Sequence, residues 1–471
     1  MTDLSAEFAA QILAIDAAAL TAADREQISR LLFDVAACAY GGTSQPTVAA
    51  LVRWAARYAA AGKARVFGAG GLRVPAPVAA LVNGTAAHSY ELDDTHDPSM
   101  SHPASVVVPA ALAVAAERGS TGAQFMAAVV AGYEAMTRIG MAANASHVIE
   151  FGLHPTALFG GFGAAAAAAR LKDFDSARLR CAWGHVLSMA SGSMQFSDET
   201  AGTAVKRVHA GYAAQQGVLA TELTEAGIEA PQRALDGKYG FFKLYGREAR
   251  PELLLERRQR LAIHDISMKP YACCRQFHSM IDGLRAATGD FADVRSIKAV
   301  KVRGPRVLAD QHMLRRPSSP MAAQYSLPFV VGATLEMGPT RYDAFAADNL
   351  ANPAILHWAD MVEVDFDGEM QAQYPAHFGC EVEVTFADGR VRSERVLDSR
   401  GTPARPFTWP QLHEKAAALT RQCRPRLDLL LLQEAIEDLA QANAVEAFAR
   451  QLAGVPEIAR SGPVRAETKG A

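Results

Sequence analysis

The stretch EVEVTFADGRVRSERVL, residues 381–397, decides the fold class expected for the second half of the chain. Apolar and polar residues alternate along EVEVTF, which is the pattern of a strand with one buried face. Asp388-Gly389 separates this run from RVRSERVL, and Asp-Gly favours a hairpin turn because both residues tolerate positive φ. IKAVKVRG (297–304) and VEVDFD (362–367) alternate similarly. Because helical patterns near 275–288, 319–335 and 341–360 interleave with these strands, residues 266–400 are predicted to form a smaller α+β domain.

The sequence before residue 266 is predicted to be helical. Thr21 opens a segment in which apolar residues recur at the spacing of one helix face, and Gly41-Gly42 ends it. The run Ala164–Ala169 is expected in a tightly packed core helix, since such short side chains let neighbouring backbones approach closely. Further helices are expected over residues 46–60, 75–88, 105–118, 121–143, 156–171, 175–191 and 206–227.

The C-terminal part of the chain is predicted to return to the helical domain. RGTPARPFTWP (400–410) has the composition of a linker, and the sequence that follows it is helical again. The expected fold class is therefore mainly α with a smaller α+β domain. A large all-helical domain is formed by both chain ends, residues 1–265 and 401–471, and the α+β lid domain, residues 266–400, is inserted between them.

The composition excludes several classes of protein. With 471 residues the chain exceeds one compact core, so two domains are expected. The 47 basic and 50 acidic residues give a net charge of -3, whereas a nucleic-acid-binding surface needs a basic excess. No apolar run reaches the roughly 18 residues of a membrane span, and no signal peptide is evident, which predicts a cytoplasmic protein without a membrane partner. Six cysteines without a CxxC pair predict reduced thiols.

The segment HSYELDDTHDPSMSHPASV, residues 88–106, concentrates ionisable side chains. Its spacing matches neither an HExxH zinc motif nor a calcium-binding loop, so no metal site is predicted. Two interpretations stay open. The acids could face solvent, or carboxylates could orient imidazoles whose ordinary pKa of about 6.5 suits proton transfer near neutral pH. The three histidines and four acids are His88, His96, His102, Glu91, Asp93, Asp94 and Asp97.

Two further segments carry a histidine or cations. HPTALFGGFG (154–163) begins with His154 and repeats the His-Pro dipeptide of residues 102–103. GTAVKRVHAGYAAQQG (202–217) places Lys206, Arg207 and His209 at a helix start, where free N–H groups already favour an anion. A solvated basic turn is the alternative for this second segment.

A third segment, MKPYACCRQFHSMIDG (268–283), surrounds two adjacent cysteines with Lys269, Arg275 and His278. Arginine can hold a carboxylate bidentately and lysine adds a compact charge. A nucleophilic cysteine is an alternative, although adjacent thiols without an acid partner are more often inert. The chain has no phosphate-binding loop, Rossmann glycine pattern or GxSxG motif. These segments together indicate a small polyanionic substrate and proton abstraction next to a carboxylate.

The order of these motifs resembles the MmgE/PrpD family, which includes 2-methylcitrate dehydratase, cis-aconitate decarboxylase and iminodisuccinate epimerase. The resemblance rests on HSYELDDTH with the following His-Pro, VVVPAALAVAAERG, GYEAMTRIG, GLHPTALFGGFGAAAAAARL and MKPYACCRQFH. It implies a homodimer with a metal-free active site in the cleft between a helical domain and a lid. The family's site residues correspond to Thr95, His102, His154, Lys206 and Lys269.

This chain also departs from the family's decarboxylases at two positions. Glu91 replaces an aspartate, and Phe329 stands where a tyrosine is expected.

The residues and the resemblance together predict a lyase without cofactors, a dehydratase similar to 2-methylcitrate dehydratase, that acts on a small di- or tricarboxylate. Proton transfer is assigned to His102 and His154, with Lys206 and Asp93 in the catalytic set. Substrate binding is assigned to Glu91, Asp94, Thr95, Lys269, Arg275 and His278. An epimerase similar to iminodisuccinate epimerase and a decarboxylase similar to cis-aconitate decarboxylase are the alternatives that use the same site. A non-catalytic carboxylate-binding protein is the alternative from another class.

Overall fold

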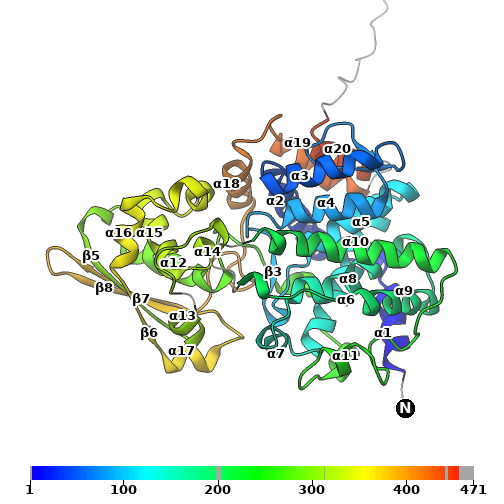
Figure 1. Ribbon diagram of the computed structural model, residues 1–471, viewed down its shortest axis with the longest axis horizontal. Helices are drawn as coiled ribbons and strands as arrows, with labels where there is room; N and C mark the ends of the chain where they lie inside the picture. The colour runs from blue at the N-terminus through cyan, green and yellow to red at the C-terminus, as the bar shows by residue number, and fades with distance from the viewer. Residues whose placement is uncertain (1–2, 198–202, 312, 441–443, 456–471) are drawn as a thin grey trace, which may run out of the picture.

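Buried apolar side chains form two hydrophobic cores in the computed structural model, which describes residues 3–197, 203–311, 313–440 and 444–455. The larger core gathers residues 8–268 and 407–452, and we call this part the helical body. The smaller core gathers residues 271–386, and we call this part the lid; Cys38, Leu92 and Leu419 from the other side also pack into it. Figure 1 shows the two parts side by side, with the lid on the left. The predicted fold class, mainly α with a smaller α+β part, is confirmed.

The helical body is built around α10, which packs against α4, α5, α8 and α9. Small residues make these close crossings possible: every residue of the run Ala164–Ala169 in α8 is fully buried. A β-carbon added to Gly217 of α10 would lie 2.4 Å from Cβ of Ala164. The body's main helices are α1 (Leu4–Leu13), α2 (Ala22–Gly42), α3 (Pro46–Ala55), α4 (Ala76–Ala87), α5 (Ala104–Arg118), α6 (Gly122–Ala142), α7 (Ala145–Glu150), α8 (Pro155–Leu171), α9 (Ser176–Met189), α10 (Val205–Glu225) and α11 (Phe241–Leu244).

The first long helix begins and ends where the sequence predicts. Thr21 caps α2 through a capping box. Its hydroxyl accepts a hydrogen bond from the Asp24 amide, and the Asp24 carboxylate accepts one from the Thr21 amide. The helix ends at Gly42, whose Cα lies against the carbonyl of Ala86 in α4. Two short antiparallel pairs also belong to the region before the lid: β1 (Ala64–Arg65) with β2 (Arg73–Val74), and β3 (Thr95–His96) with β4 (Ile266–Ser267).

The lid contains a four-stranded sheet in the order β6-β5-β7-β8. β7 and β8 form the predicted hairpin, and Gly389 at its turn has φ of 88°. The alternation read from the sequence is confirmed in β7, where Cys380, Val382, Val384 and Phe386 are buried. β5 pairs antiparallel with β7 and parallel with β6, and α12 packs against β7 and β8. The strands are β5 (Ile297–Gly304), β6 (Val362–Phe366), β7 (Cys380–Phe386) and β8 (Val391–Val396).

The lid helices differ from the sequence prediction in two places. The helix expected over 319–335 is divided at Tyr325-Ser326, because the Ser326 side chain caps a new helix at the Phe329 amide. The helix expected over 341–360 is α-helical only from Pro353, where Asn352 provides the cap and proline takes the first turn, and two short 3-10 helices, Tyr342–Phe345 and Ala347–Asn349, precede it. The lid helices are α12 (His278–Ala287), α13 (Arg306–Gln311), α14 (Pro320–Gln324), α15 (Leu327–Met337), α16 (Pro353–Asp360) and α17 (Gly368–Gln373).

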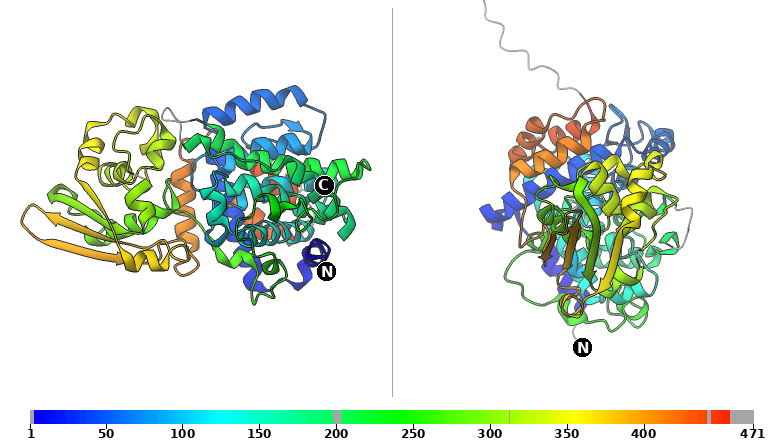
Figure 2. Two further views of the ribbon diagram at one scale, coloured as in Figure 1. Left: turned by 60° about the horizontal axis from the view of Figure 1, so that its bottom comes forward. Right: turned by 90° about the vertical axis from the view of Figure 1, so that its left-hand side faces the viewer.

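The chain returns to the helical body through α18 (Trp409–Thr420), α19 (Leu429–Glu437) and α20 (Ala444–Ala453). α18 packs on α2 and stands between the body and the lid in both Figure 1 and Figure 2. The last part of the predicted C-terminal helical segment, residues 456–471, lies outside the described residues. None of the helices in the described ranges is long and apolar enough to cross a membrane.

Candidate active site

The histidine-rich and acid-rich segment connects α4 to α5 and is buried. His88 ends α4, β3 pairs with β4, and His102 precedes α5. This pairing brings Thr95 opposite Ser267, two residues before Lys269. Since His88, Glu91, Asp93, Asp94 and His102 are all buried, the interpretation of a solvated loop is wrong for these side chains. The same segment instead forms a wall where the body meets the lid.

Four histidines lie together at this wall: His88 directly after α4, His102 just before α5, His154 directly before α8 and His209 within α10. The ring centroids of His88 and His102 are 5.1 Å apart, and those of His102 and His154 are 6.5 Å apart. His154 caps the start of α8, and its Nδ1 lies 3.1 Å from Nδ1 of His209 in α10. The predicted pair His102 and His154 is therefore brought together, and His88 and His209 join it.

The position of His102 fixes which of its nitrogens carries hydrogen. Nδ1 lies 2.7 Å from the backbone carbonyl oxygen of Asp94, and this oxygen can only accept a hydrogen bond. Nδ1 therefore donates, with the Thr95 hydroxyl 3.2 Å from the same nitrogen. Burial and the nearby Lys269 ammonium lower the pKa of His102 to about 4. At neutral pH the ring is uncharged and Nε2 has a free lone pair.

Asp93 and Asp94 are neighbours in the sequence, but the pKa values of their carboxyl groups are shifted in opposite directions. Asp93 accepts a hydrogen bond from Nδ1 of His88 at 2.6 Å, with both side chains fully buried. Burial alone would raise the pKa of Asp93, but His88, His102 and Lys269 together lower it below its ordinary value. Asp93 is therefore ionised. Burial lowers the pKa of His88 to about 3 against the effect of this carboxylate.

The Asp94 side chain points away from the histidines and supports the fold. Its carboxyl group accepts hydrogen bonds from the Ala104 amide at 2.9 Å and from the Tyr133 hydroxyl at 2.8 Å. Burial raises the pKa of Asp94 to about 8, so the group is protonated at neutral pH. The structure thus places Asp94 behind the site, where it holds the start of α5, and its backbone carbonyl is the part that reaches His102.

A cluster of cations surrounds Glu91. Lys206 and Arg207 from the first turn of α10 bind its Oε1, the arginine at 2.5 Å and the lysine in a shorter contact. Lys269 lies 3.5 Å from Oε2, and the Tyr325 hydroxyl from the lid is 3.4 Å from the same oxygen. Burial and the nearby Arg207 and Lys269 cations lower the pKa of the Lys206 ammonium well below its ordinary value. We call Lys206, Arg207 and Lys269 the cation cluster.

Two of the residues that contact Glu91, Arg207 and Tyr325, are not in the predicted set. Arg207 follows Lys206 directly, and its position at a helix start was a signal for an anion site. Tyr325 has no such signal, because it comes from a lid segment 234 residues from Glu91. Phe329, where the resemblance places a tyrosine, is fully buried in the lid core. A tyrosine therefore does reach the site, from four positions earlier in the chain.

Arg275 and His278 take other partners. Arg275 binds the Asp97 carboxylate at 3.0 Å and the Ser399 hydroxyl at 3.2 Å. His278 is buried in the lid, with Nε2 3.3 Å from the carbonyl oxygen of Cys273. Burial raises the pKa of both the Cys273 and the Cys274 thiol, which disfavours a thiolate nucleophile.

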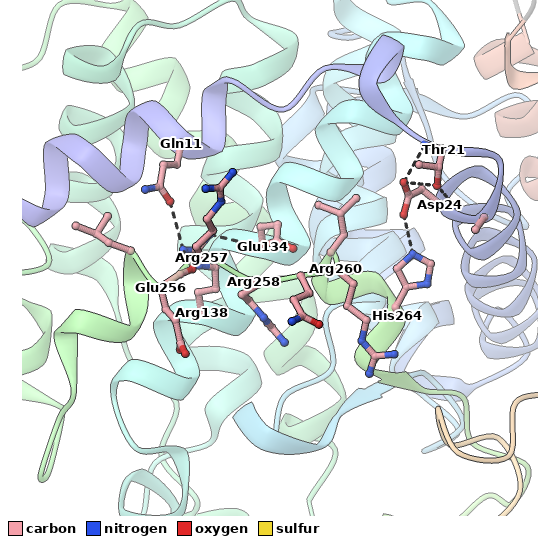
Figure 3. Close-up of a pocket in the computed structure, with 14 residues that line it drawn as sticks. Gln11, Thr21, Asp24, Glu134, Arg138, Glu256, Arg257, Arg258, Arg260 and His264 are labelled. Carbon is pink, nitrogen blue, oxygen red and sulfur yellow. Dashed lines mark hydrogen bonds and ion pairs between the residues drawn. The ribbon is translucent and has the colours of Figure 1, made fainter.

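A separate cavity of about 770 Å³ lies on the body between α1, the start of α2, α6 and residues 255–264 (Figure 3). Several of its charged side chains form ion pairs: Arg258 and Arg260 with Asp265, which does not itself line the cavity, and Asp24 with His264. None of the histidines of the wall lines it. The cavity is therefore separate from the candidate site.

The fold and the site define a helical protein whose lid closes over a buried group of neutral histidines and carboxylate-binding cations. The chain belongs to the MmgE/PrpD family: residues 6–254 match the MmgE/PrpD N-terminal domain and residues 271–438 match the MmgE/PrpD C-terminal domain. The family predicted from the sequence motifs is confirmed.

Several relatives are similar over most of their length, and they share one name. Cis-aconitate decarboxylase of Aspergillus terreus is 28% identical over 396 residues, which cover 79% of this chain and 80% of the relative. Cis-aconitate decarboxylase of Homo sapiens is 26% identical over 432 residues, covering 89% of this chain and 88% of the relative. The Mus musculus enzyme of the same name is 24% identical over 468 residues, covering 94% and 93%.

Proposed function

We propose that this protein is a cofactor-independent lyase that removes CO2 or water from a small carboxylate substrate through a carbanion-like state. The single observation that carries this proposal is the cation cluster beside His102. Cations fixed in a buried site stabilise negative charge that develops beside a substrate carboxylate, which is often the largest contribution to catalysis. A neutral histidine with a free Nε2 lone pair exchanges a proton with the reacting carbon.

Loss of CO2 is the first candidate. The relatives named cis-aconitate decarboxylase support it. In this reaction the bond between carbon and the leaving carboxylate breaks, and its electron pair stays on the substrate. Lys206 and Lys269 bind a carboxylate that remains on the substrate, and this carboxylate shares the negative charge left when CO2 departs. An anionic substrate raises the pKa of His102, so that this residue can take up a proton and deliver it to carbon.

Loss of water, the reaction expected from the sequence, is the second candidate. It is favoured by the tautomer of His102, because Nε2 carries a lone pair and can act as a base at neutral pH. In this reaction His102 removes a proton beside a carboxylate, and the hydroxyl group leaves with a second proton from the site. His154, hydrogen-bonded to His209, is the candidate donor once the anionic substrate raises its pKa and it takes up a proton from solvent, because burial otherwise keeps this histidine neutral.

The experiment is a proton NMR assay in D2O on chelator-treated protein, combined with a measurement of released CO2. The substrates are cis-aconitate, 2-methylcitrate, citrate and iminodisuccinate. A decarboxylase releases CO2 and forms a product one carbon shorter, whereas a dehydratase forms a conjugated alkene without CO2. Deuterium entering a substrate carbon with loss of chirality and no new product would identify an epimerase. No reaction and no exchange on any of the four would contradict the proposal.

We also propose that the partners are a small di- or tricarboxylate and a second copy of the chain, with no nucleic acid or membrane, and that the protein is cytoplasmic. The family resemblance supports a homodimer, and the balanced charge of the chain disfavours nucleic acid. Light scattering on the purified protein gives its mass in solution, for which twice the chain mass of 50.2 kDa is expected.

A further inference from the structure

We propose that the cavity between α1, α6 and residues 255–264 binds the phosphate group of a small phosphorylated ligand, which Arg138 and Arg258 hold (Figure 3). Its volume of about 770 Å³ lies within the range of about 300–1,000 Å³ that is typical of small-molecule sites. The cavity shares no lining residue with the candidate active site, so this inference does not depend on the proposed function.

Arg138 of α6 is a buried arginine that is only partly paired. The residue is 7% exposed. Its Nη2 donates to the Glu256 carbonyl oxygen at 3.1 Å, and its Nη1 lies 3.6 Å from the Glu134 carboxylate. Its Nε is buried and has no hydrogen-bond partner among the described residues. A buried charged donor without an acceptor costs free energy, which favours an anion in the cavity that this arginine lines.

Arg258 adds a second such donor to the same cavity. Its Nη2 binds Asp265, which also binds Arg260, so one carboxylate serves two guanidinium groups. Within the described part of the chain, the buried Nη1 of Arg258 has no partner. Burial lowers the pKa of Arg138, and the nearby Arg258 lowers it further, against the effect of Glu134. An anion that contacts both guanidinium groups would offset this repulsion.

His96 provides a third donor beside Arg258. Its Nδ1 accepts a hydrogen bond from the Ser99 amide at 3.2 Å, and an amide N–H only donates, so the neutral ring carries its hydrogen on Nε2. Nε2 is buried and unpaired among the residues that the structure describes. Burial lowers the pKa of His96 to about 3, and the nearby Arg258 contributes to this shift. β3 places His96 opposite Ile266, the residue after Asp265.

The acidic residues that line the cavity do not take the place of such an anion. Asp24 already accepts hydrogen bonds from Thr21 and His264. Glu134 accepts one from the Ala262 amide, and Glu256 is exposed. The unpaired donors therefore stay free for a ligand.

The origin of the three donors favours phosphate over carboxylate. Arg138 comes from α6, Arg258 from the segment before β4, and His96 from β3. A tetrahedral phosphate group offers three oxygens that point in different directions, whereas a planar carboxylate offers two. Arginine is also the side chain best suited to phosphate, because its fork donates two parallel hydrogen bonds.

The test titrates inorganic phosphate into the full chain by isothermal titration calorimetry at pH 7.5, with the ionic strength held constant by sodium chloride. We expect saturable binding. In Arg258→Gln, which removes the guanidinium group and its unpaired donor, the dissociation constant should rise at least about tenfold, because charge-assisted hydrogen bonds are lost from a buried contact. The same titrations with acetate should show no such loss, and an equal loss would assign the site to carboxylates and overturn the proposal.

Arg257→Gln is the matched control, because it removes the same charge from the neighbouring, exposed arginine, and it should change the dissociation constant by less than about threefold. Thermal unfolding without phosphate shows whether each variant is folded. Arg258→Lys keeps the charge but loses the fork, so it should also weaken binding, and it replaces Arg258→Gln if that protein does not fold. An unchanged dissociation constant in the folded Arg258 variant, an equal loss in Arg257→Gln, or no phosphate binding by the unmodified protein would overturn the inference.

Discussion

The backbone carbonyl oxygen of Asp94 lies 2.7 Å from Nδ1 of His102, and this contact determines the chemistry that the imidazole can perform. A carbonyl oxygen accepts and never donates, so the opposite nitrogen, Nε2, presents a lone pair. The carboxyl group of the same aspartate is turned the other way, toward Ala104 and Tyr133. One residue thus supports the fold with its side chain and orients the proposed proton-transfer group with its backbone.

The pair Asp93 and Asp94 allows a matched comparison of stability. Asp94→Asn should be more stable than the native protein at pH 7, because folding must protonate a carboxyl group whose pKa is raised by burial to about 8, whereas the amide carries no such cost. This advantage develops between about pH 4 and the folded pKa of about 8 and stays nearly constant above it. Asp93→Asn should be destabilising by about 1.5–3 kcal/mol, because it removes a charged hydrogen-bond partner of His88. Thermal unfolding at pH 7 and pH 9 checks both. Equal changes in the unfolding midpoint of the two variants would contradict the protonated state assigned to Asp94 and the ionised state assigned to Asp93.

The buried histidines predict that stability falls in mild acid. Burial lowers the pKa of His88 and His96 to about 3 and of His102 and His209 to about 4. Between about pH 4 and 6.5 the unfolded chain therefore binds more protons than the folded protein.

Stability is full above about pH 6.5 and is lost as the pH falls toward 4. Each histidine contributes up to about 1.4 kcal/mol per pH unit. Asp94, Asp34 and Glu222, whose pKa values are raised by burial, act in the opposite direction. His154 and His278, whose pKa values burial also lowers, add to the effect of the four histidines. The measurement is the urea unfolding midpoint at pH 7.5 and pH 5.5, at constant ionic strength. An equal or higher midpoint at pH 5.5 would rule out neutral buried histidines.

The contact between α8 and α10 predicts a strong effect of a single methyl group. A β-carbon at Gly217 would lie 2.4 Å from Cβ of Ala164 and 2.5 Å from the amide nitrogen of Ala165. Gly217→Ala should therefore lower the free energy of unfolding by about 1–3 kcal/mol through overpacking. Gly71→Ala is the control, because that glycine is exposed with no atom near its added β-carbon. A Gly217→Ala protein as stable as the Gly71→Ala protein would show that α8 and α10 are farther apart than the structure places them.

Lys415 links the C-terminal helix α18 to the candidate site. Its ammonium group is 2.6 Å from Asp34 of α2 and 2.7 Å from the Leu92 carbonyl, and both charged side chains are buried. Lys415→Met should destabilise the protein by about 3–5 kcal/mol, because it leaves a buried carboxylate without its cation. The double variant Asp34→Asn/Lys415→Met should recover part of that loss. Chemical denaturation of the two single variants and the double variant gives the coupling energy, and strictly additive losses would contradict a direct pair.

Much of the fold follows from local sequence patterns. The Asp388-Gly389 turn, the alternation in β7 and the start of α2 at Thr21 depend on neighbouring residues, and they occur as predicted. The break at Ser326 depends on whether a serine side chain caps a helix or faces solvent, which a helical pattern alone does not distinguish. The sequence pattern therefore does not predict a helix end that is set by a cap inside a continuous helical pattern, as at Ser326.

The partners within the candidate site follow from tertiary packing, which the sequence does not reveal. The segment 88–106, which includes His102, is predicted from its composition, and His154, Lys206 and Lys269 lie near it. The partner of Asp93, however, is His88 of the preceding helix, and Arg275 is held by Asp97. Tyr325 reaches Glu91 only because the lid folds onto the body. Such side-chain pairs depend on how helices and loops that are distant in the sequence pack against one another.

The most direct test of the account is the turnover of His102→Gln compared with the native protein. Both are treated with chelator and followed by proton NMR in D2O, on whichever carboxylate the native protein converts. We predict that the native protein places deuterium from solvent on the reacting carbon. The variant should be folded, with turnover slower by about 10²- to 10⁴-fold. A folded His102→Gln protein with native turnover would contradict the role assigned to His102.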